Sequence, residues 1–248
     1  MQEIQTDSLL KLKDVTKTVS SGTEQLTILQ GISLEIKPGE TTAIVGASGC
    51  GKSTLLGIMA GLDECSSGEI WLQGQALHQL DEDQRAALRA QGVGFVFQNF
   101  QLLLGLTALE NVSLPIEMSG QHSFSGSQNL ARDWLNKVGL AHRITHYPRQ
   151  LSGGEQQRVA IARAFAAQPK VLFADEPTGN LDSKTGHQII DLLFDLNREH
   201  QTTLILVTHD EYLAKRCDRT LRIEDGKIIN DTQSNLDTTT PEEQRSHA

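Results

Sequence analysis

The sequence contains one glycine-rich stretch, Gly46-Ala47-Ser48-Gly49-Cys50-Gly51-Lys52-Ser53-Thr54, that follows the pattern G-x-x-x-x-G-K-[ST]. It stands between a short apolar run, Thr41–Val45, and a helical pattern from Lys52 to about Ala60. Glycines let a backbone curl so that successive N–H groups point inward at phosphate oxygens, and a helix N-terminus adds the positive end of its dipole. The stretch therefore predicts a phosphate-binding loop between a strand and a helix.

Two side chains of this loop have expected roles beside a bound nucleotide. Lys52 is expected to reach the β- and γ-phosphates, and Ser53 is expected to offer its hydroxyl oxygen to Mg²⁺, a hard ion that prefers oxygen ligands. The competing interpretation is a glycine-rich turn that contains an accidental lysine. The flanking strand and helix argue against it, so the sequence predicts a site for Mg²⁺ and ATP.

A pair of carboxylates follows another apolar strand, Val171–Ala174. Ligands of a parallel sheet sit at the carboxyl ends of its strands, so Asp175 and Glu176 are expected beside the phosphate loop. Asp175 is placed to hold Mg²⁺ through its water shell, and Glu176 to orient and deprotonate an attacking water. The alternative is an acid pair that only caps the next turn.

Two further strand ends carry polar side chains. His209 follows the apolar run Leu204–Val207 and could hydrogen-bond the γ-phosphate, while Asp210 is expected to cap the next helix. Gln98 follows the strand Val93–Phe97 and could offer its amide oxygen to Mg²⁺ or water. Each of these single-residue assignments depends on the motifs around it, because a lone histidine or glutamine there is more often structural.

A second glycine motif begins a helix that is expected to run to about Ala167: Leu151-Ser152-Gly153-Gly154-Glu155-Gln156-Gln157-Arg158. Glycines and a serine before a helix can form another anion-binding nest. The competing interpretation is a capping box between Ser152 and Glu155. A capping box accounts for the helix start but not for Gly153 and Gly154, so the motif suggests a nest that serves another chain's nucleotide.

The composition is that of a soluble globular chain with an acidic surface. The 248 residues carry a formal net charge of -9, which disfavours nucleic acid as a partner. The cysteines Cys50, Cys65 and Cys217 are too scattered for a disulfide framework, and their odd number suits a reducing compartment. We expect no signal peptide and no membrane span, because no apolar run approaches the ~18 residues that a span needs.

The order of predicted elements indicates an α/β fold. Strands are expected within 9–36, helices broken by Gly, Ser and Pro within 99–167, and alternating strands and helices after 171. Such alternation argues for a mostly parallel sheet covered on both faces. The polar segment 231–248 has no apolar period, so we expect it to be a disordered tail.

The motifs stand in the order of ABC-type ATPase domains, and the resemblance covers nearly the whole chain. It rests on the phosphate loop, Gln98, Leu151–Arg158, Ala174–Pro177, Gly179–Asp182 and His209. The stretches Phe95–Gln98 and Thr107–Val112 resemble the LolD/MacB/FtsE branch, and most closely its YbbA-like group. The resemblance implies a P-loop NTPase core over 1–230, with an N-terminal antiparallel β-subdomain and a helical subdomain inserted at about 99–165.

The resemblance also implies partners. Two chains would form a head-to-tail homodimer around two ATP molecules, with the phosphate loop, Gln98, Asp175, Glu176 and His209 of one facing Ser152, Gly153 and Gly154 of the other. The cleft formed by about 99–111 would receive a cytoplasmic helix of a separate membrane permease. The run Leu102–Leu104 suits such a groove, although ordinary core packing accounts for it equally well.

The leading hypothesis is therefore a cytoplasmic ATPase subunit that works at the inner face of the cell membrane and drives a permease. The alternative is a soluble ABC-type ATPase that acts on nucleic acid or ribosomes. A single phosphate loop, an acidic balance and the absence of sustained heptads disfavour this alternative. A nucleotide switch without hydrolysis is disfavoured by Glu176.

Two positions depart from the family pattern or add to it. The family usually has an aromatic residue near the N-terminus that stacks on adenine, and Val19 stands at the corresponding position. Valine can pack on adenine without π-stacking, so we expect weaker selectivity for that base. Cys50 lies inside the phosphate loop, where oxidation could inhibit binding, although a tolerated small side chain is the simpler interpretation.

Overall fold

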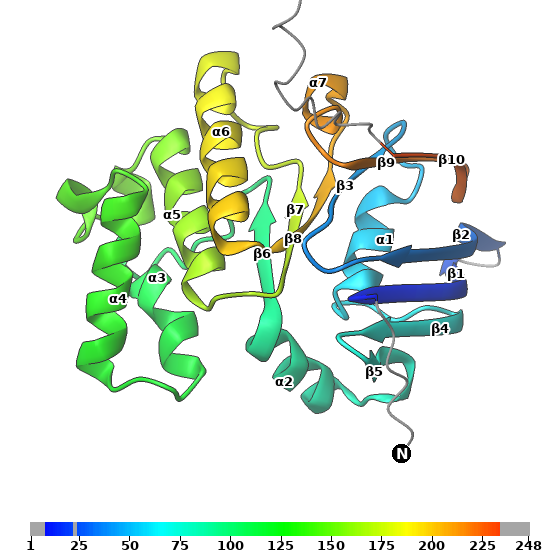
Figure 1. The fold of residues 1–248 in the computed structure, drawn as a ribbon, viewed down its shortest axis with the longest axis horizontal. Coiled ribbons are helices and arrows are strands. Elements are labelled where there is room, and N and C mark those ends of the chain that lie inside the picture. Colours follow the sequence, from blue (N-terminus) through cyan, green and yellow to red (C-terminus); the bar gives the residue numbers. More distant parts are fainter. Residues whose placement is uncertain (1–7, 22–23, 234–248) are drawn as a thin grey trace, which may run out of the picture.

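A six-stranded sheet runs through the middle of the computed structural model, which describes residues 8–21 and 24–233 (Figure 1). We call it the central sheet. Its order is β10-β9-β3-β8-β7-β6, with bounds Lys227–Gln233, Arg219–Glu224, Thr41–Val45, Thr203–Val207, Val171–Asp175 and Val93–Phe97. All neighbours pair in parallel except β10 and β9. The predicted mostly parallel sheet is confirmed.

A second sheet, fully antiparallel, is built largely from the N-terminal part of the chain. Its order is β2-β1-β4-β5, with bounds Glu24–Ile36, Leu10–Ser21, Ser67–Leu72 and Gln75–Ala76. The short 3₁₀ helix η1, Leu77–Gln79, and the helix α2, Glu82–Gly92, follow it. This is the predicted antiparallel β-subdomain.

Helices cover both faces of the central sheet. The helix α1, Lys52–Met59, lies on the same side as the antiparallel sheet, and the helix α6, Ser183–His200, lies on the other (Figure 1). Beyond α6 are the three helices of the predicted insertion and the 3₁₀ turns between them: α3 Ala108–Met118, α4 Phe124–Lys137, η2 Ala141–Arg143, η3 Pro148–Gln150 and α5 Gly153–Ala166. A short helix, α7 Glu211–Ala214, precedes β9.

Alternate residues of the central strands pack into two different hydrophobic cores. On β7, Leu172 and Ala174 face the core made with α3 to α6, whereas Val171 and Phe173 face the core made with α1 and the antiparallel sheet. Both faces of these strands are buried, so the strands read as continuous apolar runs rather than alternating ones. This double burial is the reason that the sequence pattern located β3, β7 and β8 so closely.

Helix α3 is longer than the sequence indicated. The sequence shows a helical pattern only over Ala108–Val112, but the helix continues through Pro115 to Met118. Its N-terminus is capped by Thr107, whose hydroxyl accepts a hydrogen bond from the backbone N–H of Glu110. The buried side chains of Val112 and Ile116 hold the helix on the core on both sides of the proline, and this tertiary packing outweighs the proline's local penalty.

The C-terminal boundary also differs from the expected one. Strand β10 extends to Gln233, so residues 231–233 belong to the central sheet and not to a tail. The guanidinium of Arg219 donates to both carboxylate oxygens of Asp231, from Nε at 2.7 Å and from Nη2 at 2.6 Å, and so holds β10 against β9. The rest of the expected tail, 234–248, lies outside the described residues. No helix within 8–21 and 24–233 is long and apolar enough to cross a membrane.

The two sheets touch at the turn between β9 and β10. The backbone N–H of Gln30, on β2, donates to the carbonyl of Gly226 at 2.8 Å, and its side-chain amide donates to the carbonyl of Asp225 at 2.9 Å. Gly226 has φ +73°, and a Cβ there would collide with the carbonyl oxygen of Ile28. Only glycine therefore allows this junction to close.

We expect Gly226→Ala to destabilise the chain more than Gly139→Ala, a control with φ +78° and open space around it. Both substitutions force alanine into a left-handed conformation, which costs about 1–2 kcal/mol. Only Gly226→Ala adds a collision with β2, worth a further ~1–3 kcal/mol. Urea unfolding of both variants measures the difference, and equal losses would show that the junction does not restrict position 226.

Candidate nucleotide-binding and hydrolysis site

The phosphate loop is wedged between two sheets. It leaves the carboxyl end of β3 and enters α1, whose N-cap is Gly51 with φ +101°. A Cβ at Gly46 would collide with the carbonyl oxygen of Ile223 on β9, and a Cβ at Gly51 would lie 2.9 Å from Cδ2 of Leu29 on β2. The glycines of the motif thus serve two purposes, because they permit both the curl of the loop and its close contact with its neighbours.

The side chain of Lys52 is folded back into this loop. Its ammonium donates to the carbonyl oxygens of Gly46 at 2.9 Å and Ala47 at 2.8 Å, and only 7% of the residue is exposed. Sγ of Cys50, which is half-buried, lies 4.0 Å from the same ammonium. The loop carbonyls therefore compensate a buried positive charge, and that charge faces the curve of the loop where an anion would bind.

Ser53 and Asp175 meet across the gap between α1 and β7. The hydroxyl of Ser53 donates to Oδ1 of Asp175 at 3.2 Å. Burial raises the pKa of Asp175, and the negative charge of Glu176 raises it further, while the bond from Ser53 and the charge of Lys52 act in the opposite direction. Nearby positive charge therefore does not fully compensate the ionised carboxylate, and a bound cation would supply the rest.

The donors at this point fit a magnesium ion in kind. A hydroxyl and a carboxylate oxygen are hard ligands of the type that Mg²⁺ takes. The described residues contain no group of three or more His, Cys, Asp or Glu that could hold a metal ion. A metal beside Ser53 and Asp175 would thus need phosphate oxygens and water to complete its coordination, which is the usual arrangement for Mg²⁺ on a nucleotide.

Glu176 and His209 form a pair at the ends of β7 and β8. Nδ1 of His209 lies 3.3 Å from Oε1 of Glu176. Glu176 has φ +44°, and its backbone N–H donates to the carbonyl of Val207 at 2.9 Å. Such a conformation is uncommon for a residue with a side chain, and it turns the chain sharply after Asp175. The pair lines a hollow of about 280 Å³ together with Thr208.

Gln98 lies against the turn that follows Glu176. Its amide Nε2 is 3.5 Å from Oδ1 of Asn180, and the amide of Asn180 donates to the carbonyl of Gln98 at 3.1 Å. The Gly179–Asp182 stretch was recognised as a family motif, but no pattern in the sequence indicated that Asn180 contacts Gln98. Only the packing of the two loops in space reveals it.

The second glycine motif is distant from the phosphate loop of the same chain. Strands β8 and β7 separate β3, which leads into the phosphate loop, from β6, against which α5 packs. Ser152 caps α5 in a capping box, with its hydroxyl 3.3 Å from the N–H of Glu155 and its own N–H 2.8 Å from Oε2 of that residue. The hydrogen bond from the Ser152 backbone N–H keeps the pKa of Glu155 low, and the Ser152 hydroxyl and Arg143 lower it further.

The two glycines of that motif have a structural explanation that the sequence did not provide. A Cβ at Gly153 would lie 3.2 Å from Cδ2 of Leu181, and a Cβ at Gly154 would lie 2.6 Å from Cγ2 of Thr185. Close packing against Leu181 and Thr185 therefore favours small residues here, whether or not an anion binds. Val19, the remaining predicted contact, is half-buried on β1 opposite Leu26, and its contact with a base stays a prediction.

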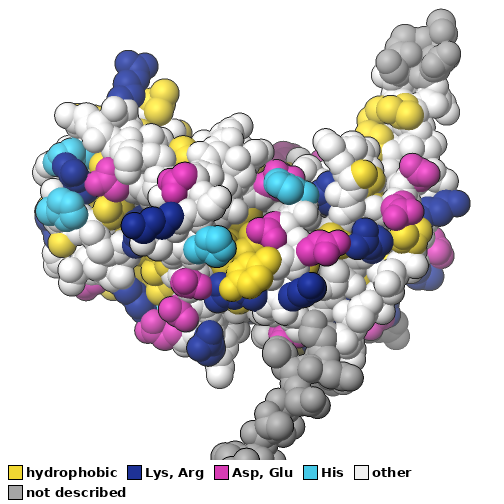
Figure 2. All heavy atoms as spheres, turned by 90° about the horizontal axis from the view of Figure 1, so that it is seen from above, with side chains coloured by type: hydrophobic (Ala, Val, Ile, Leu, Met, Phe, Trp, Pro, Cys, Tyr) yellow, Lys and Arg dark blue, Asp and Glu magenta, His cyan; other side chains and the backbone are white. Residues whose placement is uncertain are grey.

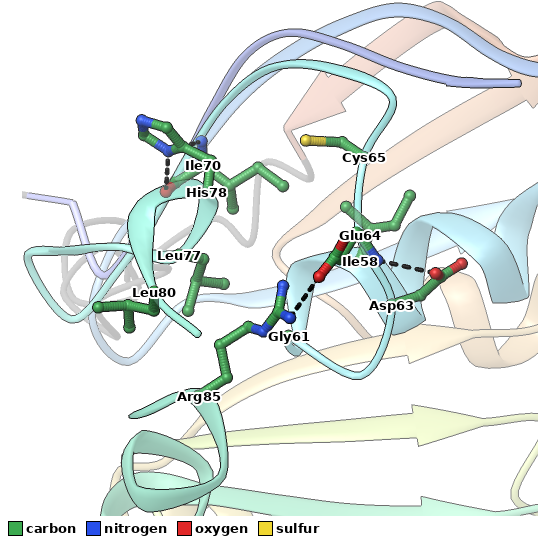
Figure 3. Close-up of a pocket in the computed structure, with 10 residues that line it drawn as sticks. All are labelled: Ile58, Gly61, Asp63, Glu64, Cys65, Ile70, Leu77, His78, Leu80 and Arg85. Carbon is green, nitrogen blue, oxygen red and sulfur yellow. Dashed lines mark hydrogen bonds and ion pairs between the residues drawn. The ribbon is translucent and has the colours of Figure 1, made fainter. Parts of the chain in front are cut away.

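A separate hollow of about 130 Å³ lies between the end of α1, the strand β4 and the start of α2 (Figure 3). Arg85 extends from α2 across it to the carboxylate of Glu64 (Figure 3) and also pairs with Glu82 at 3.3 Å. The charge of Arg85 is therefore already paired with two carboxylates. This hollow belongs to the attachment of α2 to the loop after α1, and not to the nucleotide site.

A sequence model of the family described as ABC transporter matches residues 29–179, which is more than half of the chain. The chain belongs to the ABC transporter family. This ABC-family chain is 58% identical over 222 residues to "Uncharacterized ABC transporter ATP-binding protein YbbA" of Escherichia coli strain K12, a match that covers 90% of this chain and 97% of YbbA. It is 49% identical over 224 residues to "Lipoprotein-releasing system ATP-binding protein LolD" of Geobacter metallireducens, covering 90% and 99%.

A solved structure of an ABC cassette has the same fold. The ATP-binding cassette MJ0796, described as a dimer in a post-hydrolysis state bound to ADP and Pi, superposes with a TM-score of 0.84 at 43% identity, covering 90% of this chain and 98% of that one. The predicted fold class and the predicted LolD/YbbA-like branch are both confirmed. The chain is an ABC-type ATPase that binds and hydrolyses ATP.

We expect Asp175→Asn to stabilise the nucleotide-free ATPase at neutral pH. The pKa of Asp175 is raised above the usual 3.8 in the folded chain, so the folded chain binds this proton more tightly than the unfolded one. The free energy of unfolding therefore falls as pH rises from 3.8 through the folded-state pKa. Asparagine lacks this cost. Thermal melts in chelator should therefore show a higher Tm for the variant at pH 7, and a difference that shrinks as pH approaches 3.8.

The control for this prediction is Asp182→Asn. Hydrogen bonds from the hydroxyl and backbone N–H of Thr185 lower the pKa of Asp182, so its charge stabilises the fold above pH 3.8 and ceases to do so as pH falls. Asparagine is also a good N-cap, but it removes that charge. Asp182→Asn should therefore lower Tm at pH 7, whereas Asp175→Asn should raise it. Equal effects of the two substitutions would contradict the assignment to burial.

Proposed function

We propose that this chain is the ATPase subunit of a membrane complex, that two copies close head to tail around two Mg²⁺-ATP molecules, and that the dimer drives a separate permease. The observation that carries the proposal is that the phosphate loop and the second glycine motif lie far apart within one chain. Lys52, Asp175 and Glu176 are gathered around the phosphate loop, while Ser152 caps α5 on the far side of β7 and β8. A second copy of the chain could supply the missing side.

Each side chain near the phosphate loop has a proposed part in hydrolysis. Lys52 exchanges its contacts with Gly46 and Ala47 for phosphate oxygens. Ser53 and Asp175 would hold Mg²⁺, with Gln98 as a further oxygen ligand, and the metal when bound would neutralise charge on the phosphates.

The catalytic pair lies one residue beyond the metal site. The carboxylate of Glu176 orients a water and takes its proton as the water oxygen attacks the γ-phosphorus and the ADP oxygen leaves. His209, 3.3 Å from that carboxylate and 71% exposed at its side chain, is free to turn toward the γ-phosphate. The polar hollow beside the pair gives water a route to the carboxylate.

The dimer is supported by the related cassette, which is described as dimeric and bound to ADP and Pi. In a head-to-tail arrangement, the N–H groups at the start of α5 and the Ser152 hydroxyl of one copy would meet the γ-phosphate on the other. The capping box and the packing of Gly153 and Gly154 hold this helix start rigidly for that contact. Preorganised donors of this kind bind anions well.

The surface after Gln98 suits a permease helix. Leu103 is 48% exposed and Leu104 57% exposed, whereas Leu102 is buried in the core. The guanidinium of Arg163 holds the loop by donating to the carbonyls of Phe100 at 3.1 Å and Gln101 at 2.6 Å. The loop therefore presents two leucines on a fixed backbone. Such a surface fits the apolar face of a helix supplied by a membrane protein.

Charge argues against the soluble alternative that acts on nucleic acid. On the face shown in Figure 2, Lys and Arg side chains are interspersed with Asp and Glu and do not form a continuous basic field. The net charge of -9 would repel a phosphate backbone. We propose instead that the chain works at the inner, cytoplasmic face of the cell membrane, bound to its permease.

Two substitutions test the catalytic assignment. Glu176→Gln should bind ATP, lose about 10²–10⁴-fold in turnover because it lacks a general base, and accumulate as a dimer. Lys52→Ala should lose ATP binding and remain monomeric. Turnover assays, equilibrium binding of ATP and light scattering after size-exclusion chromatography measure all three properties. Wild-type turnover in Glu176→Gln would contradict the role given to this carboxylate.

A capture experiment tests the membrane partner. Tagged Glu176→Gln chain with ATP should recover a multi-pass membrane protein from detergent-solubilised membranes, as identified by mass spectrometry. Adding Leu104→Glu should abolish recovery, because it places a charge in the proposed apolar contact. Adding Ile229→Glu should not, since Ile229 is similarly exposed, at 51%, but lies on β10. Recovery of ribosomal or nucleic-acid-bound proteins alone would favour the soluble alternative.

A further inference from the structure

Asn180 joins two loops that are far apart in sequence. Its side-chain amide donates to the carbonyl oxygen of Gln98 at 3.1 Å and to Oδ1 of Asn99 at 2.7 Å. Its own Oδ1 lies 3.5 Å from Nε2 of Gln98. One amide thus contacts both the backbone and the side chain of Gln98, at the point where β6 ends.

The turn that carries Asn180 is continuous with the catalytic carboxylate. The N–H of Gly179 donates to the carbonyl of Glu176 at 3.0 Å, and the N–H of Leu181 donates to the carbonyl of Thr178 at 3.0 Å. Asp182 then caps α6. These short hydrogen-bonded links on either side restrain the backbone that carries Asn180, so its side chain extends from a turn tied to Glu176.

Gly179 makes the contact with Gln98 tighter. A Cβ at this position would lie 2.5 Å from Nε2 of Gln98, so the glutamine side chain packs directly on the backbone of the turn. The residues after Gln98 are also restrained, because Arg163 donates to the carbonyls of Phe100 and Gln101. Two adjacent residues of the turn, Gly179 and Asn180, thus contact the Gln98 side chain at its Nε2.

We propose that Asn180 is a positioning residue for ATP hydrolysis, which holds Gln98 at a fixed distance from Glu176. This inference rests on the proposed function, since it takes Gln98 as a ligand of Mg²⁺ or of the attacking water. Asn180 does not need to touch the nucleotide. Its contacts with the carbonyl oxygen and with Nε2 of Gln98 set where the Gln98 amide stands. The same contacts connect the permease-facing loop to the catalytic turn.

A kinetic experiment tests the assignment. Asn180→Ala should lower kcat by about tenfold, within the range expected when a reacting group is misplaced, and leave KM for ATP within about twofold. It should also raise the Mg²⁺ concentration needed for half-maximal turnover. The control Asn136→Ala removes an amide of the same kind from the exposed face of α4, so it should keep near wild-type kcat. A fall in Tm with unchanged kcat and Mg²⁺ dependence would mean that Asn180 is only structural.

A double-mutant cycle decides whether Asn180 acts through Gln98. If it does, Asn180→Ala should cost no more than about twofold in kcat when it is added to Gln98→Ala, although each change alone is costly. Losses that multiply would overturn the proposal, as would a Gln98→Ala variant with normal kcat beside an impaired Asn180→Ala. The Glu176→Gln turnover assay is independent of this cycle, so failure of the inference and failure of the proposed catalytic role are separable.

Discussion

The close approach of the phosphate loop to its neighbouring strands is the constraint on which the site depends. At Gly46 the loop meets a carbonyl of β9, and at Gly51 it meets a side chain of β2. The β9–β10 turn meets β2 in the same way at Gly226. At these three glycines the backbone approaches its neighbour too closely for a Cβ. The three contacts therefore fix the phosphate loop, the central sheet and the antiparallel sheet relative to one another. A phosphate-binding curve of backbone N–H groups needs that rigidity, because each donor must already point at its acceptor.

The parallel arrangement of the central strands places the chemistry at one edge. β7 and β8 end side by side, so Asp175, Glu176 and His209 meet although His209 is more than thirty residues away in sequence. Burial there is unfavourable for the charge of Asp175, and its partner Ser53 offers only a neutral hydroxyl. A bound cation would neutralise the charge of Asp175, so its binding would offset the cost of burying that carboxylate.

Much of this arrangement could be predicted from sequence, because it depends on local pattern. The phosphate loop has a fixed spacing, and strands buried on both faces, such as Thr203–Val207, have sharp apolar boundaries. Other features depend on contacts between distant segments. Nothing near Asn180 indicates Gln98, nothing near Gly154 indicates Thr185, and nothing before Pro115 shows that core packing carries the helix past it.

The central sheet divides the interior into two compartments that share only a layer of backbone. Leu172 and Ala174 belong to one compartment and Val171 and Phe173 to the other, so side chains on opposite faces of the sheet pack against different elements. The helical side can therefore vary in sequence, as it must if related cassettes fit different partners, without disturbing the packing beneath the phosphate loop. Because a single sheet separates the two cores, the core packed against α3 to α6 can change in sequence while the core beneath the phosphate loop is conserved.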